Sequence, residues 1–487
     1  MDTKKLRQKI LDLAIHGKLI PQDPNDEPAS VLLERIRAEK ERLIAEGKIK
    51  RSKRSATSDT SHYKNEVPFE VPENWEWTTI GELCSFLSRG KSPKYSEERK
   101  YPVFAQKCNL YDGDISLEKA RFLDPETISK WSDEYKLIDG DILVNSTGTG
   151  TVGRTRLFHS DVLGNYPFVV PDSHVSVVRS FEEIESKFVL AFLSSDYGQT
   201  YIEDNLAGST NQKELYIGVL DNMQFPLPPH EEQFRIVTTV DKWFSLIDTL
   251  ESAKEDLQTS ITQAKSKILD LAIHGKLVPQ DPNDEPASEL LKRINPKAVA
   301  SCDNPHYGNV PFEIPDNWAW VRIDEINKFK SKSVNPQNYP TDQFELYSVP
   351  TFETGNPEFP YGKDVASSKV DVEEGDVLLC KINPHLNRVW VVRRRMSQLK
   401  SLASSEWIVI RTDEILPEYL ALTMQSPYFR ELMMSNVSGV GGSLMRAQPT
   451  FVKQYMIPIP PIREQKRIVA KIQETFYMLH SIAESLN

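Results

Sequence analysis

The segment Gly148-Thr-Gly-Thr-Val-Gly153 comes closest in this chain to a cofactor-binding motif. Its glycines have the G-x-G-x-x-G spacing of loops that bind dinucleotides or S-adenosylmethionine. Such a loop must open a helix, because the helix N-terminus faces the phosphates or the carboxylate of the cofactor. The next residues, Arg154–His159, have the pattern of a strand. We therefore expect that this chain binds no cofactor.

Other catalytic patterns are incomplete. Gly90-Lys91-Ser92 resembles the end of a P-loop, but Ser85 stands where its first glycine is required. Asn383-Pro384-His385 and Asn304-Pro305-His306 partly match the (D/N)PP(Y/F) motif of adenine methyltransferases, and both lack the second proline and the aromatic residue. Because these motifs are incomplete, we expect no catalytic residue. The sequence also lacks a C-x-x-C pair of the kind that binds zinc, so we expect no metal site. The cysteines, which we expect to stay reduced in the cytoplasm, are Cys84, Cys108, Cys302 and Cys380.

Polar, small and basic residues gather in the predicted loops of two regions, 78–225 and 321–457. Arg, Lys, Asn and Gln can hydrogen-bond to base edges, and Ser, Thr and Gly let backbone amides approach phosphates. These loops are either a DNA interface or ordinary solvated turns. The candidate DNA-binding residues of the first region are Arg89, Lys91, Lys94, Tyr95, Lys107, Asn109, Asn145, Ser146, Thr147, Thr149, Arg154, Asn211, Gln212 and Lys213. Those of the second region are Lys328, Lys330, Lys332, Lys381, Asn383, His385, Asn387, Arg388 and Arg446.

The composition excludes several classes of protein. The chain has 487 residues, with 39% hydrophobic and 26% charged residues, which is enough for roughly two to four domains. We expect no membrane span, because no apolar run reaches about 18 residues, and no secretory signal, because Met1–Leu6 leads directly into a charged pattern. The net charge of −11 argues against an overall basic surface. A local basic groove or a partner subunit could still supply phosphate contacts.

The chain contains an internal repeat. Lys9–Ser30 recurs as Lys267–Ser288 with a single change, Ile20 to Val278. The connecting segments match closely while the regions between them have diverged, which favours one scaffold that carries two different readers. The second copy of the repeat ends at the C-terminus almost at the position from which the N-terminal segment would continue it. We therefore expect a ring of two repeats with its termini close together. The shorter matches are Val71–Trp77 with Ile314–Trp320, Gly140–Leu143 with Gly375–Leu378, and Pro226–Val237 with Pro458–Val469.

The connecting segments predict long helices. Glu231–His274 has no proline or glycine, and from Leu257 its apolar residues have the spacing of a coiled coil. Such a helix would form a rod of roughly 65 Å. Arg463–Leu486 and Thr3–His16 would together form an equivalent rod, antiparallel to the first. The alternative is a long helix buried within one ordinary domain.

Proline-rich turns follow Gly17 and Gly275, and we expect Ser30 and Ser288 to be N-caps of the next helices. In the first copy this helix would run to about Glu46. The basic loop 48–54 after it could touch DNA or a partner, or be a solvated tail. In the second copy Pro296 would stop the helix early.

The two diverged regions predict an α/β (α+β) fold of two small units with mixed sheet. Turn residues separate their short strands, and helices are predicted at Ile184–Leu193 and Pro417–Met424. The expected strands are Tyr101–Gln106, Asp141–Asn145, Val175–Arg179, Val377–Ile382, Arg388–Arg393 and Glu406–Ile410.

The doubled motifs resemble those of the specificity subunits of type I restriction–modification systems, over essentially the whole chain. The resemblance implies two pseudo-repeated target recognition domains, separated by an antiparallel pair of long coiled-coil helices in a cyclic, pseudo-twofold organisation. The segments would be 1–66 (helix and turn that complete the distal rod), 67–230 (first recognition domain), 231–309 (central helix and turn), 310–461 (second recognition domain) and 462–487 (C-terminal helix). The motifs are Pro72-Glu-Asn-Trp75 with Pro315-Asp-Asn-Trp318, Gly140-Asp-Ile-Leu-Val144 with Gly375-Asp-Val-Leu-Leu379, and Pro226-Leu-Pro-Pro-x-x-Glu-Gln233 with Pro458-Ile-Pro-Pro-x-x-Glu-Gln465.

In function, the resemblance implies a non-catalytic subunit that determines which sequence of double-stranded DNA the complex recognises. Each recognition domain would read one half of an asymmetric, bipartite site, and the helices would fix the spacer. Two methylation subunits would bind S-adenosylmethionine and methylate adenine, and two restriction subunits would use ATP and Mg to translocate and cleave DNA. The alternatives are a DNA methyltransferase with degenerate motifs, and a DNA-binding module or interaction scaffold outside restriction.

Overall fold

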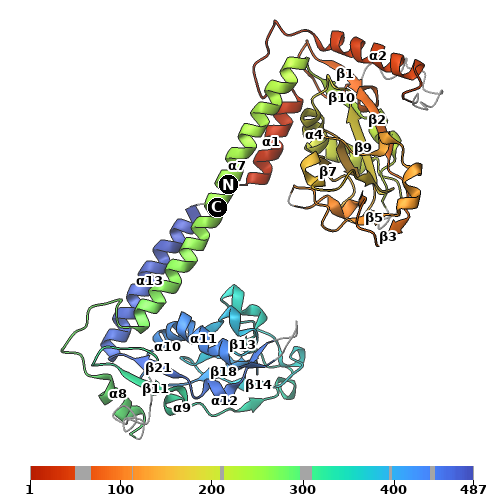
Figure 1. The fold of residues 1–487 in the computed structure, drawn as a ribbon. Helices are drawn as coiled ribbons and strands as arrows, with labels where there is room; N and C mark the ends of the chain where they lie inside the picture. The colour runs from red at the N-terminus through yellow and green to blue at the C-terminus, as the bar shows by residue number, and fades with distance from the viewer. Residues whose placement is uncertain are drawn as a thin grey trace. The chain divides into compact units, whose positions relative to one another are not determined.

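The computed structural model describes residues 2–49, 67–111, 113–208, 213–296, 310–393, 398–438 and 445–485. The chain divides into two compact units, Met1–Ser252 (unit 1) and Ala253–Asn487 (unit 2). The boundary falls inside one 44-residue helix, α7 (His230–Ile273) (Figure 1). Its ends agree to one residue with the predicted helix Glu231–His274.

Unit 1 combines short strands with short helices. The helices before α7 are α1 (Thr3–Ile15), α2 (Ala29–Ala45), α3 (Ile80–Leu83), α4 (Ser186–Ser194), α5 (Asp196–Asp204) and α6 (Ile217–Asn222). The strands are β1 (Glu76–Thr79), β2 (Cys84–Arg89), β3 (Tyr95–Ser96), β4 (Pro102–Phe104), β5 (Arg121–Leu123), β6 (Ile142–Asn145), β7 (Thr155–Leu157), β8 (Val170–Pro171), β9 (Val175–Ser180) and β10 (Gln224–Leu227).

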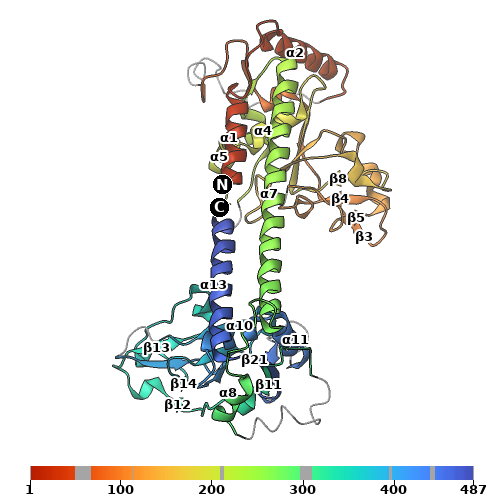
Figure 2. The ribbon, with the colours of Figure 1, turned by 90° about the vertical axis from the view of Figure 1, so that its left-hand side faces the viewer.

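Two four-stranded sheets form the body of unit 1. The first has the order β2-β9-β6-β7 and is antiparallel throughout. Its central strand β6 is buried along its whole length, as its apolar run Ile142-Leu-Val144 requires. The second sheet, β3-β5-β4-β8, contains the parallel pair β4–β8, so the predicted mixed sheet is confirmed (Figure 2).

A separate two-stranded ladder brings the start and the end of the region 76–227 together. β1 follows Trp75, β10 leads into α7, and the two strands pair antiparallel from Glu76 opposite Leu227 to Thr79 opposite Gln224. The chain therefore leaves this region beside the point where it enters.

Helix α1 packs antiparallel to the first part of α7, as predicted. Arg7 donates hydrogen bonds to Asp248 and Glu251 at 2.5 and 2.9 Å. Beyond α1 the chain continues toward the start of α7, where Gln22 donates to Glu232 at 2.7 Å. Later residues of the N-terminal segment thus contact earlier residues of α7, which is the pattern of an antiparallel arrangement.

Unit 2 repeats this plan. Its helices after α7 are α8 (Ala287–Ile294), α9 (Ile323–Ile326), α10 (Pro417–Gln425), α11 (Pro427–Ser435), α12 (Pro449–Val452) and α13 (Ile462–Ser485). Its strands are β11 (Ala319–Arg322), β12 (Ser333–Val334), β13 (Phe344–Tyr347), β14 (Lys369–Asp371), β15 (Val377–Cys380), β16 (Val389–Val391), β17 (Lys400–Ala403), β18 (Trp407–Ile410), β19 (Val437–Ser438), β20 (Arg446–Ala447) and β21 (Met456–Ile459).

The sheets of unit 2 correspond to those of unit 1. β16-β15-β18 is antiparallel, β12-β14-β17-β13 contains the parallel pair β13–β17, and β11 pairs with β21 as β1 does with β10. Helix α13 lies antiparallel to the second part of α7. Lys265 of α7 lies over the Phe476 ring at 5.6 Å, and Gln280 in the turn after α7 donates to Glu464 at 2.6 Å.

The turns after the long helices correct one prediction: Ser30 and Ser288 are not N-caps. Helices α2 and α8 begin one residue earlier, at Ala29 and Ala287, after the prolines that precede them. The N–H of Ala29 donates to the carbonyl of Asn74 at 2.9 Å, and Ala287 makes the same bond to Asn317. Backbone from the adjoining motif thus satisfies the helix start in place of a serine side chain.

Gly17 and Gly275 end their helices with left-handed backbone, at φ +65° and +66°. A Cβ at Gly17 would lie 2.5 Å from the Pro72 ring, and one at Gly275 would lie 2.3 Å from the Pro315 ring. Glycine is required here by both the backbone conformation and the close approach.

The predicted strands and helices are found with ends that differ by at most two residues. α2 ends at Ala45 and α8 stops at Ile294, before Pro296, as expected. Residues 50–66, which include most of the basic loop, lie outside the described part, as do Met1, Leu486 and Asn487. The ring arrangement, the closeness of the termini and the five segment boundaries stay predictions.

Candidate nucleic-acid interface

In unit 1 many of the predicted DNA-binding residues meet at one corner, where β6 ends and β9 begins. Here Ser146 donates its N–H to the carbonyl of His174 at 2.8 Å, and its own carbonyl accepts from Leu215 N–H at 2.8 Å. The loop that contains Gln106 reaches the same place, since Asn145 donates its amide to the Gln106 carbonyl at 3.2 Å. Four loops that are distant in sequence thus converge, and we call this place corner 1.

The inner residues of corner 1 are structural. Asn109, Asn145 and Ser146 are buried, with 1%, 0% and 0% exposure. Asn109 donates to the Asn145 side chain at 2.7 Å, and the hydroxyls of Ser146 and Ser176 lie 2.6 Å apart. These three side chains hold the loops together and present nothing to a ligand, so for them the predicted base contact does not fit the structure.

The outer residues of corner 1 face solvent. Lys107, Thr149 and Lys213 are exposed. Thr147 shares a hydrogen bond of 2.7 Å with the ring of His174, which is also exposed. Arg154 donates to the Asn109 carbonyl at 2.8 Å, and its guanidinium lies 5.7 Å from the ring of Tyr111.

The remaining candidates in unit 1 are bound to other groups. Arg89 pairs with Glu214 and donates to the Ser173 carbonyl beside corner 1. Lys91 lies over the Tyr135 ring at 3.9 Å, and Lys94 pairs with Asp124 at 2.7 Å. Tyr95 lies under the guanidinium of Arg121 at 3.5 Å. The last three belong to the second sheet or its loops, and Asn211 and Gln212 lie outside the described residues.

Unit 2 has a matching corner, corner 2, built on the same backbone bonds. Lys381 donates its N–H to the Glu406 carbonyl at 3.1 Å and accepts from Ala447 N–H at 2.8 Å, as Ser146 does with His174 and Leu215. The side chains differ completely. The Lys381 ammonium lies 3.6 Å from the Glu406 carboxylate, and Arg446 lies 3.3 Å from the other oxygen of that carboxylate.

The loop between β15 and β16 carries four more candidates. Asn383 and Asn387 both have left-handed backbone, at φ 47° and 49°. Asn387 donates its amide to the Gln425 carbonyl at 2.9 Å, and Arg388 donates to Ile382 at 3.0 Å. The ring Nδ1 of His385 is buried without a partner.

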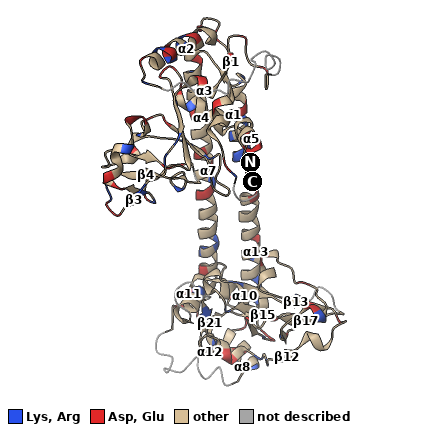
Figure 3. Cartoon of the chain, turned by 90° about the vertical axis from the view of Figure 1, so that its right-hand side faces the viewer, with Lys and Arg blue, Asp and Glu red and all other residues tan. Residues whose placement is uncertain are grey.

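The three lysines before β13 lie apart from corner 2. Lys328 pairs with Asp413 at 2.6 Å and Lys332 with Asp371 at 3.6 Å, while Lys330 is exposed. Lys332 lies beside β12 and β14 of the second sheet, whereas Lys328 donates its N–H to the Arg411 carbonyl just after β18 at 2.9 Å. Figure 3 shows acidic and basic residues interspersed within each unit.

Both corners rest on the same buried frame. Asp141, which precedes β6, accepts two hydrogen bonds from the Arg179 guanidinium, each 2.7 Å. In unit 2 Asp376 accepts from Arg411 at 2.7 and 2.8 Å. The two carboxylate side chains are 0% and 1% exposed, while those of Arg179 and Arg411 are 16% and 26% exposed.

The repeated Glu-Gln motifs form the joint between the sheets of each unit and its long helix. Glu232 accepts from the Trp75 indole at 3.0 Å, and Glu464 accepts from Trp318 at 3.0 Å. The neighbouring Gln233 accepts from Glu185 N–H, which begins α4, at 2.8 Å. Burial raises the pKa of both Glu232 and Glu464.

Sequence reasoning missed His174 and Glu406 as parts of the corners. Each lies just before a strand, and nothing local marks it as a neighbour of the β6 or β15 loop. The internal alignment of the repeat was the available signal, because both residues occupy the same place in it.

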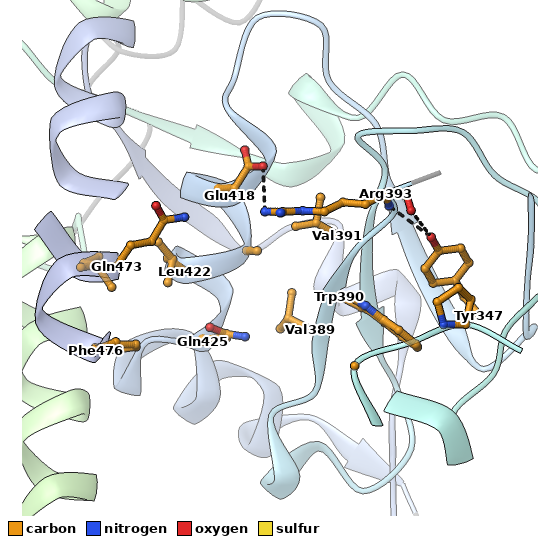
Figure 4. Close-up of a pocket in the computed structure, with 14 residues that line it drawn as sticks. Tyr347, Val389, Trp390, Val391, Arg393, Glu418, Leu422, Gln425, Gln473 and Phe476 are labelled. Atoms are coloured by element: carbon orange, nitrogen blue, oxygen red, sulfur yellow. Dashed lines mark hydrogen bonds and ion pairs between the residues drawn. The ribbon is translucent and has the colours of Figure 1, made fainter. Parts of the chain in front are cut away.

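A separate pocket of about 490 Å³ opens in unit 2 between α10, α13 and β16 (Figure 4). Val389, Leu422 and Phe476 form apolar walls, while Arg393 and Glu418 face each other at 3.3 Å. Since these two charges neutralise one another, the pocket gives no clear signal for a charged ligand.

The loop Gly148–Gly153 is followed by strand β7, as predicted, and not by the helix that a dinucleotide site needs. Within the described ranges no group of His, Cys, Asp and Glu could hold a metal ion. Nor does any helix there have the length and apolarity needed to cross a bilayer. Cys84, Cys108 and Cys380 are buried free thiols, and burial raises the pKa of Cys84 to about 12.

Two α+β units thus share one frame and carry two differently equipped corners. The type I restriction modification DNA specificity domain family matches residues 72–259. The chain is 28% identical to the EcoEI specificity subunit of Escherichia coli, over 99% of this chain and 90% of that protein. It is 27% identical to the EcoAI specificity subunit of the same species, over 97% and 88% of the two chains.

Over nearly its whole length the chain is similar to the specificity subunits of type I restriction–modification systems. These are the non-catalytic subunits of their complexes, so the methyltransferase and scaffold alternatives are not favoured. The fold agrees: a solved structure described as "Structural basis underlying complex assembly and conformational transition of the type I R-M system" matches with a TM-score of 0.53 and 17% identity. The match covers 86% of this chain and 94% of that one.

Proposed function

We propose that this specificity subunit reads an asymmetric, bipartite sequence on double-stranded DNA, with one half-site for each unit. The observation that carries the proposal is the match between corners 1 and 2. Ser146 and Lys381 make the same backbone bonds, yet the side chains around them differ in size and charge. A shared frame with different polar groups is what two readers of different base sequences require.

The partners in this proposal are two methylation subunits and two restriction subunits. S-adenosylmethionine, ATP and Mg would bind to those partners, because the target adenine is flipped into a methyltransferase pocket. This chain would determine the DNA sequence that is recognised, and the α7 rod would set the distance between the two half-sites. The complex would work in the cytoplasm, where it meets chromosomal DNA.

The test is to co-express the chain with the methylation subunit of its own system and map adenine methylation across the host genome. A bipartite motif with a fixed gap, absent when this chain is omitted, is the expected result. A complex that assembles but adds no methylation would contradict the proposal.

A further inference from the structure

The tip of the β15–β16 loop presents an apolar side chain to solvent. Leu386 ends the short 3-10 turn Pro384–Leu386 and is 51% exposed, whereas β15 before the loop is buried along its whole length. Single exposed leucines are common on protein surfaces. What distinguishes Leu386 is the backbone that holds it.

Leu386 lies between Asn383 and Asn387, which are the non-glycine residues with left-handed backbone in the described part of the chain. Asn adopts left-handed backbone more readily than other residues with a Cβ. What holds this loop is the set of hydrogen bonds that its backbone and side chains make.

The bonds that impose this conformation come from three directions. Asn383 donates its N–H to the Met445 carbonyl at 2.8 Å, and Asn387 donates its amide to Gln425 of α10 at 2.9 Å. Within the loop, Leu386 N–H donates to the Asn383 carbonyl at 3.0 Å. The backbone that carries Leu386 is therefore tied to the segment before Arg446 and to the end of α10.

The setting of Leu386 is polar and partly basic. Lys381 and Arg446 flank the same loop, with side chains 23% and 47% exposed, and share one carboxylate, that of Glu406. This leaves one positive charge in excess where the loop meets solvent, which suits a phosphate-bearing ligand. In a major groove the apolar group that a rigid leucine can contact is the C5 methyl of thymine.

We propose that Leu386 reads a thymine methyl group in the half-site of unit 2. This inference rests on the proposed function and deepens it by assigning one base feature to one side chain. Lys381 and Arg446 would hold the DNA backbone, while the leucine distinguishes thymine from the other bases at a single position.

The experiment replaces thymine by uracil, which removes only the methyl group. Once the recognition sequence is mapped, each thymine of both strands is replaced singly, and the affinity of the assembled methylation complex is measured. We expect the wild type to lose about fourfold at one position in the half-site of unit 2, as for one buried methyl group. Leu386→Ala should bind the thymine DNA more weakly and show no further loss with uracil at that position.

The control is Ile138→Ala, which removes a side chain of similar exposure, 50%, from unit 1. Its uracil scan should match that of the wild type in the half-site of unit 2. Thermal melting of Leu386→Ala should be unchanged, because the side chain is half exposed.

Three outcomes would overturn the proposal. One is a scan in which no uracil position couples to Leu386→Ala, and another is a half-site made only of G·C pairs. The third is a loss of assembly with the methylation subunit that is equal on all DNA, which would make Leu386 a protein contact. If the complex directs no methylation at all, the proposed function itself fails, and this inference fails with it.

Discussion

The indole N–H of Trp75 donates a 3.0 Å hydrogen bond to the buried carboxylate of Glu232, across 157 residues of sequence. Gln22 donates to the same carboxylate at 2.7 Å. The start of the recognition region, the turn after α1 and the start of α7 are thus tied at one side chain. Trp318, Gln280 and Glu464 repeat this contact in unit 2 at 3.0 and 2.6 Å.

The joint predicts a pH dependence of stability. Burial raises the pKa of Glu232 and Glu464 above the ordinary 4.5, so between that value and the raised one the folded state binds more protons than the unfolded state. Stability contributed by these groups therefore falls as pH rises through this window. The double variant Glu232→Gln, Glu464→Gln has no carboxyl groups to titrate at these two positions. The difference in melting temperature between the wild type and this variant should therefore change with pH only between 4.5 and the raised pKa values. A constant difference from pH 4 to 8 would contradict the shift.

The buried ion pairs beneath the corners predict large losses of stability. Arg179→Met leaves the buried carboxylate of Asp141 without its partner, and we expect a loss of about 3–5 kcal/mol in the free energy of unfolding of unit 1. Arg411→Met should do the same to unit 2. Lys9→Met serves as control, because the Lys9–Asp12 pair is exposed and should contribute less than about 1 kcal/mol. Urea unfolding followed separately for each unit measures all three, and equal small losses would contradict the prediction.

Corner 1 predicts a change in salt dependence. Lys107 is exposed and has no ion pair among the described residues, so its charge is available to a phosphate. Lys107→Ala should weaken binding to all sequences alike and reduce the slope of log affinity against log salt by about 1. Lys94→Ala is the matched control, because Lys94 already pairs with Asp124 at 2.7 Å. Titrations of the assembled complex at several salt concentrations decide between them.

Substitutions in the two corners should alter different halves of the recognised DNA sequence. Lys381→Ala or Asn383→Ala should disturb only the half-site of unit 2, and His174→Ala only that of unit 1. The reason is that each side chain makes its contacts within its own unit. Methylation mapping of each variant gives the readout, and an equal loss at both half-sites would refute the two-reader arrangement.

The sequence predicted the local elements well, because apolar spacing and proline or glycine signals are local. Helix α7 and strand β6 were found to within one residue. Ser30 failed as an N-cap because the partner of that helix start, Asn74, comes from a distant segment. The same limit applies to the site: Asn145 looked like a base reader, and only the fold shows that Asn109 and Gln106 occupy it.

The two joints have a consequence for how new addresses arise. Gln22, Trp75 and Glu232 make the same contacts as Gln280, Trp318 and Glu464, so the attachment of a recognition region is standardised. A recognition region that is exchanged at these joints keeps the same contacts to its long helix, whatever residues its corner carries. A gene pool with several first regions and several second regions would therefore yield the product of their numbers in distinct specificities.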